Sequence, residues 1–257
     1  KKEGCPMNVL VILAVMLCMA MVMIGGKTGA ISFLSLFLNF LVLLGTVYMM
    51  NDPANDPILW VIIACVIISC INLFFINGIN TTTLAAFLST VITMVGLLLF
   101  ILFMSDLTMI NGFGEEEVDE LSLLSLYIGI SFAELAAVVI IISTIGAITD
   151  ISISITSPMR EVYLHNPGMS RRELVQAGFA IGRDLLGTST NTLFFAFFGS
   201  YLGLWIWFKD LSYSLGDIVN SKIFAAEMLT ILCAGIGIAL VIPIASWITA
   251  FLLVRKK

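Results

Sequence analysis

Charged residues are scarce in this chain. They make up 11% of its 257 residues, whereas an average soluble domain contains about 25%. The 12 lysines and arginines are spread along the sequence and form no extended basic patch. Nucleic-acid binding depends on such a basic surface. We therefore expect no nucleic-acid partner.

Motifs for catalysis, nucleotide binding and metal binding are also missing. The sequence has no P-loop, no G-x-G-x-x-G motif and no recognisable catalytic triad. Cys65 and Cys70 lack the spacing of metal ligands, and the single histidine, His165, lies in a charged segment. We therefore expect no cofactor, no metal and no enzymatic activity. The one catalytic alternative is an aspartyl pair of Asp150 with Asp184, which requires their carboxyl groups to lie close together.

Long apolar runs fill the sequence instead. Hydrophobic residues make up 60% of the chain, and several runs reach the roughly 20 residues that a helix needs to cross a bilayer. These runs are continuous, whereas the strands of a transmembrane barrel alternate apolar and polar residues. The composition predicts an all-α fold: a polytopic bundle of about seven transmembrane helices, in one domain over residues 1–257, surrounded by lipid.

Residues 1–106 are expected to form two helical hairpins. Each hairpin contains a polar turn with glycine, GGKTG in the first and NGINTTT in the second. Asn39 and Asn72 lie within the apolar runs, and we expect them to make interhelical hydrogen bonds. The four helices are predicted at residues 9–24, 30–50, 58–76 and 84–104.

Residues 107–124 are predicted to be an acidic extracytoplasmic loop, with a cluster of five carboxylates over residues 115–120. The loop either attracts cations or is simply a solvated connection. Residues 125–257 are expected to form the core helices. The apolar run over residues 121–157 is too long for one simple crossing. Either the helix is strongly tilted, or residues 121–132 form an interfacial piece and the crossing starts near Glu134, which we favour.

The remaining core helices are separated by a basic segment. We expect a loop over residues 158–172, containing Arg160, Arg171 and Arg172. Ser170 and Glu173 have the spacing of a capping box, so a helix is predicted to start there and to run to about Phe208. The last helix is predicted over residues 223–254, with a kink at Pro243. The loop over 158–172 and the C-terminal Arg-Lys-Lys are basic, so both are expected to face the cytoplasm in the cell membrane.

One carboxylate, Asp150, lies inside an apolar helix, where a charge costs roughly 2.5–3.5 kcal/mol on insertion scales. Helical spacing places Ser143, Ser154 and Ser157 on the same face. Asp150 can bind a proton, or it can face a cation or a hydrated cavity. We predict that it couples proton or ion movement. A structural role, in which Asp150 only locks helix packing through hydrogen bonds, is the alternative.

The candidate site extends to the next helix, which carries a polar patch. The coupling residues are predicted to be Asp150, Ser154, Thr188, Thr190, Asn191 and Thr192. Supporting roles are predicted for Glu134, Arg183, Asp184 and Glu227, with Arg183 as a candidate counter-charge. For Glu134 and Glu227 a purely structural role at the interface is an equal alternative.

Three motifs carry a family resemblance. The segments GAITDISISITSPMREV and SRRELVQAGFAIGRDLLGTSTNTLFFAF, followed by a glycine-rich helix with VIPIASWI, resemble the YibE/F-like family of multi-pass bacterial membrane proteins over about the last half of the chain. The same half is more remotely similar to the transmembrane half of SecD, SecF and the resistance–nodulation–division (RND) superfamily. The matching positions are Asp150, Arg160–Glu161, Ala177–Phe179 and Thr188–Thr192.

The resemblance implies a function and a partner. In the RND superfamily the corresponding aspartate is implicated in proton coupling, which implies that role for Asp150. RND proteins also carry large extracytoplasmic domains, whereas the longest outward loop here is too short for one. The resemblance therefore implies a paired membrane subunit that supplies such a domain, in a hetero-oligomer. We predict a proton-coupled subunit of an export or translocation complex, with a non-transporting scaffold or assembly subunit as the alternative.

Overall fold

The computed structural model describes residues 9–52, 54–108, 132–210 and 212–254, and every regular element among them is helical. The elements are α1 (Val9–Met50), α2 (Pro57–Cys70), the π-helix η1 (Ile71–Phe75), α3 (Thr81–Thr108), α5 (Phe132–His165), α6 (Arg171–Ser200), α7 (Leu202–Asp210), α8 (Leu215–Asn220) and α9 (Lys222–Val254). The all-α prediction is confirmed. The acidic loop, residues 107–124, lies almost entirely outside the described residues, as does the segment 121–131.

Five of the described helices are long and apolar enough to cross a membrane, or six if α6 and α7 together form one span. This is the polytopic bundle that the composition predicts, with a smaller count than about seven. The difference arises at α1, which we expected to be two helices and which counts here as one. Residue Gly26 nevertheless breaks it, because its backbone (φ 55°, ψ −130°) is not helical.

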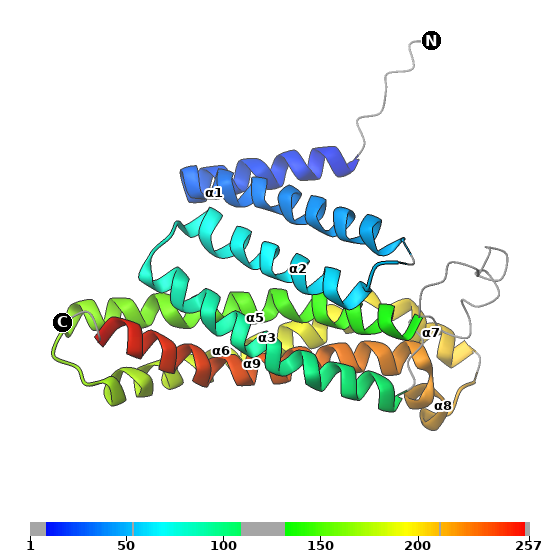
Figure 1. Ribbon diagram of the computed structural model, residues 1–257. Helices are drawn as coiled ribbons and strands as arrows, with labels where there is room; N and C mark the ends of the chain where they lie inside the picture. Colours follow the sequence, from blue (N-terminus) through cyan, green and yellow to red (C-terminus); the bar gives the residue numbers. More distant parts are fainter. Residues whose placement is uncertain (1–8, 53, 109–131, 211, 255–257) are drawn as a thin grey trace, which may run out of the picture.

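The break at Gly26 reverses the chain, so that α1 has two arms (Figure 1). The left-handed φ at Gly26 favours glycine, which has no Cβ. Gly29 is buried where the arms meet, and a Cβ there would collide with the Met21 carbonyl oxygen. The turn predicted at GGKTG therefore exists, and glycine permits both its geometry and the close approach of the arms.

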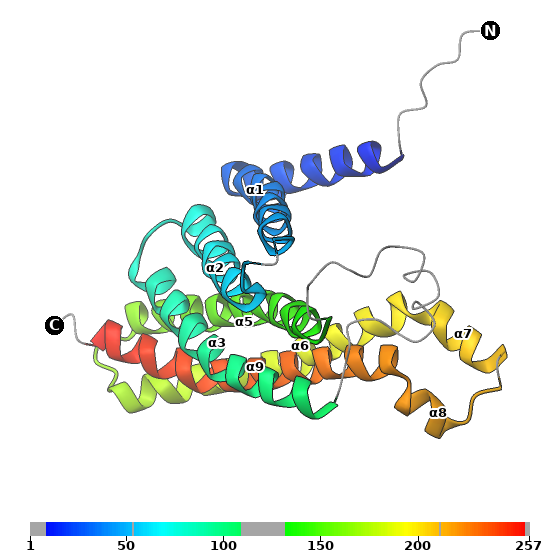
Figure 2. The ribbon, with the colours of Figure 1, turned by 45° about the vertical axis from the view of Figure 1, so that its right-hand side comes forward.

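Helix α1 lies outside the main bundle and packs on α2 and η1 (Figures 1 and 2). One polar contact joins them: Asn39 Nδ2 donates to Asn72 Oδ1 at 2.7 Å. Both side chains come from apolar segments, where an unpaired amide would be costly. The predicted interhelical hydrogen bonding of these two asparagines is confirmed.

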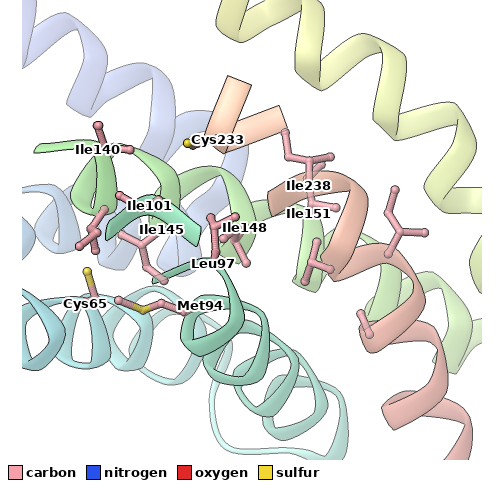
Figure 3. Close-up of a cluster of buried hydrophobic side chains, with 14 of the residues drawn as sticks. Cys65, Met94, Leu97, Ile101, Ile140, Ile145, Ile148, Ile151, Cys233 and Ile238 are labelled. Atoms are coloured by element: carbon pink, nitrogen blue, oxygen red, sulfur yellow. The ribbon is translucent and has the colours of Figure 1, made fainter. Parts of the chain in front are cut away.

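The core forms where α9 packs against α3, α5 and α6, with α3 also packed against α5 (Figures 1 and 2). Figure 3 shows Leu97 of α3, Ile148 of α5 and Ile238 of α9 in this core. Each of these side chains is at most 2% exposed. On α3, Met94, Leu97 and Ile101 are buried at intervals of three and four residues, and this spacing defines the inward face of that helix.

Glycines allow α9 to approach its neighbours closely. A Cβ on Gly178 would lie 2.5 Å from Ser246 Oγ and 2.6 Å from Met159 Sδ, and a Cβ on Gly182 would collide with Ile242. Gly178 and Gly182 form a G-x-x-x-G motif on α6, a spacing that brings helix backbones together in membranes. Gly237 of α9 likewise allows close packing, because a Cβ there would press against side chains of α3 and α5.

The loop predicted over residues 158–172 is wrong. Helix α5 continues through Pro158 to His165, and the connection to α6 is only residues 166–170. Proline lacks an N–H and removes one helical hydrogen bond, which membrane helices tolerate where neighbouring groups compensate. The predicted capping box is confirmed, because Ser170 and Glu173 bond reciprocally at the start of α6.

The other end of α6 also differs from the prediction. The helix that we expected to run to Phe208 ends at Ser200, and the chain bends by 53° into α7. The short helix α8 lies between α7 and α9. The predicted last helix is confirmed, since α9 spans Lys222–Val254. The crossing start near Glu134 stays a prediction, because the residues before Phe132 lie outside the described part of the chain.

The glycine contact between α6 and α9 leads to a test of stability. Gly182→Ala should lower the free energy of unfolding in detergent by about 1–3 kcal/mol, the usual cost of overpacking a filled core. Ile242 is branched at Cβ and cannot swing aside freely. Gly187→Ala is the matched control on the same helix, because a Cβ there meets no atom within 4 Å. If both variants unfold like the wild type, the close contact at Gly182 is wrong.

Candidate functional site

Asp150 lies on the face of α5 that points away from the other described helices. It is exposed together with Ser143, Ser154 and Ser157, which are the residues that helical spacing places on one face. The opposite face, which includes Ile148 and Ile155, is buried. The predicted polar face therefore exists, but it belongs to the outer surface of the bundle.

Pro158 adds a backbone group to this surface. A helical residue normally donates its N–H to the carbonyl four residues earlier, and proline has no N–H to donate. The Ser154 carbonyl oxygen is thereby left without its helical donor, one turn from Asp150. The exposed surface of α5 thus combines a carboxylate, serine hydroxyls and one additional carbonyl acceptor.

Two threonines of α6, Thr188 and Thr192, satisfy their hydroxyl groups within their own helix. Thr188 Oγ1 donates to the carbonyls of Asp184 and Leu185 at 3.2 and 3.1 Å, and Thr192 Oγ1 donates to the Thr188 carbonyl at 2.9 Å. Among the described residues, no hydrogen bond joins Asp150 to α6 or to any other helix. The alternative in which Asp150 locks the packing of this chain through Thr188 or Asn191 has no such bond to support it.

The remaining predicted residues of α6 divide between two surfaces. Thr190 is half-buried and faces α9, where its Cγ2 lies 3.6 Å from the position of a Cβ on Gly235. The others are exposed on the outer surface: Arg183, Asp184, Thr188, Asn191 and Thr192. The structure therefore places most of the predicted patch outward, as it does Asp150, and separates Thr190 from it.

Of the two other predicted carboxylates, Glu227 makes a defined contact. Its Oε1 accepts a hydrogen bond from the Tyr201 hydroxyl at 2.6 Å, and Tyr201 is the residue at the bend between α6 and α7. The contact fastens that bend to the start of α9, as a structural role requires. Glu134 lies exposed in the first turn of α5.

A second polar set lies inside the bundle, and sequence reasoning missed it. The side chain of Ser152 donates to the Ala86 carbonyl at 2.9 Å, linking α5 to α3. Together with α9, these two helices carry a set of buried hydroxyl residues. The set consists of Thr82, Thr83, Ser89, Thr90 and Thr93 on α3, Thr144, Thr149, Ser152 and Thr156 on α5, and Ser246 and Thr249 on α9. The serine and threonine residues clustered over 81–93 could have indicated this buried polar set, but we interpreted the start of that cluster as a turn.

Four of these hydroxyls have no hydrogen-bond partner among the described residues: those of Thr82, Thr90, Thr149 and Thr249. The contacts Ser152–Ala86 and Ile148–Gly237–Leu97 show that α3 runs antiparallel to α5. This register brings Thr90 and Thr149 to neighbouring levels of the interface. Buried hydroxyls without partners are rare in folded proteins, so this interface is unusually polar for the interior of a membrane bundle.

The described residues include no group of three or more histidine, cysteine, aspartate or glutamate side chains that could hold a metal ion. The four described cysteines are free, at Cys18, Cys65, Cys70 and Cys233. The chemistry available on the outer surface of α5 and α6 is therefore that of a carboxylate among hydroxyl and amide groups. Such a set can bind a proton, a cation or a complementary polar surface.

Comparison with known proteins identifies a family. The family described as YibE/F-like protein matches residues 13–255, so the similarity extends well beyond the last half of the chain. Neither a curated protein nor a solved structure matches. The remote similarity to SecD, SecF and RND proteins stays a prediction.

Because these hydroxyls have no hydrogen-bond partner among the described residues, we expect that removing one of them does not destabilise the protein. Thr149→Val should leave the free energy of unfolding unchanged or raise it, because valine has the same shape and needs no hydrogen bond. Thr93→Val is the matched control: its equally buried hydroxyl donates to the Ser89 carbonyl at 2.7 Å, and its loss should cost about 1 kcal/mol. Both can be measured by thermal unfolding in detergent. A comparable loss in Thr149→Val would mean that its hydroxyl is hydrogen-bonded in the folded protein.

Proposed function

The chain belongs to the YibE/F-like protein family, and we propose that this membrane-spanning helical protein is a subunit of a proton-coupled export or translocation complex. One observation carries the proposal: Asp150 lies on the exposed face of a membrane-spanning helix, beside hydroxyl groups and with no hydrogen-bond partner among the described residues. Ionisable residues within membrane segments are rare and mark proton or ion pathways.

The cost of a charge in lipid is the physical basis of the coupling. An ionised carboxylate at the centre of a membrane helix costs roughly 2.5–3.5 kcal/mol on insertion scales, and a neutral one costs less. Asp150 is therefore stable on this surface when it holds a proton, or when a polar partner covers it. Binding and release of the proton would then favour different arrangements of α5 against that partner.

The surrounding polar groups provide partners for the two protonation states. The Ser154 hydroxyl and carbonyl follow Asp150 by one turn, and Thr188, Asn191 and Thr192 are exposed on the neighbouring helix α6. Arg183 is the candidate counter-charge, with Asp184 next to it. Thr190 lies apart from this surface, and we assign it no further role in the pathway.

A paired subunit is the second part of the proposal. No described residue covers the polar surface of α5 and α6, and hydrocarbon does not solvate amides or carboxylates. Apart from the segment 109–131, which is not described, the connections between consecutive helices are at most six residues long. We propose that a membrane subunit with an extracytoplasmic domain covers this surface, as the resemblance to RND proteins implies.

Orientation follows from the basic residues. Arg171, at the start of α6, lies over the ring of Phe251, close to the end of α9, at 5.1 Å. The basic segment after α5 and the C-terminal end of α9 are therefore at the same end of the bundle. The excess of arginine and lysine there favours the cytoplasmic side of the cell membrane, and we propose that the C-terminus is cytoplasmic.

A non-transporting scaffold is the alternative function. Asp150 makes no internal hydrogen bond among the described residues, so in that case it would act by binding the partner subunit. Asparagine keeps the size of aspartate and adds a hydrogen-bond donor. A scaffold should therefore tolerate Asp150→Asn or change only in assembly, whereas a proton carrier should lose its activity.

Proton flux tests the proposal directly. The tagged chain, with any subunit that co-purifies, is reconstituted in liposomes that contain a pH-sensitive dye, and a pH gradient is imposed. We expect Asp150→Asn to reduce the flux to the level of protein-free liposomes, because an amide does not exchange a proton in this pH range. Asp52→Asn is the control, since Asp52 lies exposed in the turn after α1.

Assembly is measured on the same samples by size-exclusion chromatography. If Asp150→Asn assembles normally and carries wild-type flux, the proton-coupling role is wrong. If flux is absent in every sample, including the wild-type complex, the scaffold function is favoured.

A further inference from the structure

A cavity of about 550 Å³ lies between the first turns of α6 and the last turns of α9. Its walls come from these two helices: Arg171, Arg172, Val175 and Gln176 from α6, and Trp247, Ala250 and Phe251 from α9. Its volume falls within the range of small-molecule binding sites. It is distinct from the polar surface around Asp150.

The polar wall of this cavity carries positive charge. Arg171 and Arg172 are adjacent, Gln176 provides an amide, and no carboxylate lines the cavity. The nearby Glu173 is engaged elsewhere, because its Oε2 accepts hydrogen bonds from the nitrogen and the hydroxyl of Ser170 at 2.7 and 2.9 Å. The cavity therefore has two cations without a lining counter-ion, which suits an anionic ligand.

The position of one arginine is held by an aromatic ring. The guanidinium carbon of Arg171 lies 5.1 Å from the centre of the Phe251 ring, within the range of a cation–π contact. A planar guanidinium forms two parallel hydrogen bonds with a phosphate group. Arg171 is thus fixed at the rim of the cavity and retains donor groups for such an anion.

The other wall is apolar and opens toward the lipid. Trp247 is 67% exposed and Phe251 is 45% exposed, and both project from the membrane-spanning helix α9. Ala250 and Val175 complete this apolar wall. Trp247 lies one turn before Phe251 along α9, which places the aromatic surface deeper in the membrane than the helix end that adjoins Arg171. The cavity is therefore charged at one end and apolar along its side.

We propose that this cavity binds one anionic phospholipid. Its phosphate would bond to Arg171, Arg172 and Gln176, and an acyl chain would lie along Trp247 and Phe251. Basic pockets between membrane helices bind anionic lipid headgroups in this way. A soluble phosphate would use the charged end alone and would leave the apolar wall exposed to the bilayer, so the combination favours a lipid.

Competition binding in detergent tests the site. The purified full chain is mixed with equal amounts of phosphatidylglycerol and phosphatidylcholine, and bound lipid is counted by native mass spectrometry. We expect one phosphatidylglycerol to bind in preference to phosphatidylcholine. Arg171→Gln and Arg172→Gln should each weaken its binding about fivefold, the effect of losing one basic residue near an anionic headgroup. Arg172→Lys should retain most of the binding.

Arg160→Gln is the matched control, because it removes one positive charge from the end of α5 outside the cavity. It should bind phosphatidylglycerol like the wild type. Equal binding of both lipids, or an equal loss in Arg160→Gln, would overturn the proposal. Inorganic phosphate that displaces the lipid at similar concentration would also overturn it and would identify a soluble-anion site.

A second measurement does not depend on the arginine variants. Phosphatidylglycerol with brominated acyl chains should quench the fluorescence of Trp247, because the proposed acyl chain lies against that side chain. The quenched component should disappear in Trp247→Phe, which keeps an aromatic wall. Quenching that is unchanged in Trp247→Phe would show that the lipid binds elsewhere.

Discussion

The hydrocarbon core of a membrane provides no hydrogen-bond partners, and this constraint explains most of the structure. It requires each backbone group to be paired within the chain, which helices achieve. Because lipid is as apolar as the side chains, helices associate through close packing. Gly178, Gly182 and Gly237 permit that packing around α9, and hydroxyls such as Ser246 Oγ, which donates to the Ile242 carbonyl at 2.7 Å, return to their own helix.

The same constraint gives helix α5 two different polar faces. Its inner face carries hydroxyl groups, including Ser152, which bonds to α3, and Thr149, which has no partner among the described residues. Its outer face carries Asp150 and Ser154. Inner hydroxyls are neutral and can be accommodated between helices, whereas an outer carboxylate needs a proton or a partner. This difference is why the outer face is the stronger candidate for function.

Much of the fold could be predicted because its signals are local. Apolar runs of membrane-spanning length, the glycine turn at Gly26 and the capping box of Ser170 with Glu173 each depend on a few neighbouring residues. Prediction failed where the wider environment outweighed a local signal. Proline usually ends a helix, but α5 continues past Pro158. The continuous apolar pattern predicted one helix through Tyr201, but α6 ends there.

The sequence by itself determined the all-helical class, the membrane environment and which residues of α5 share a face with Asp150, because helix periodicity and the length of apolar runs are properties of the chain alone. Only the tertiary structure decided which way that face points. Apolar residues such as Ile148 and Ile155 bury one side of α5 against α3 and α9. That packing turns Asp150 outward, and it also brings Arg171 of α6 together with Phe251 of α9, residues that are far apart in the sequence.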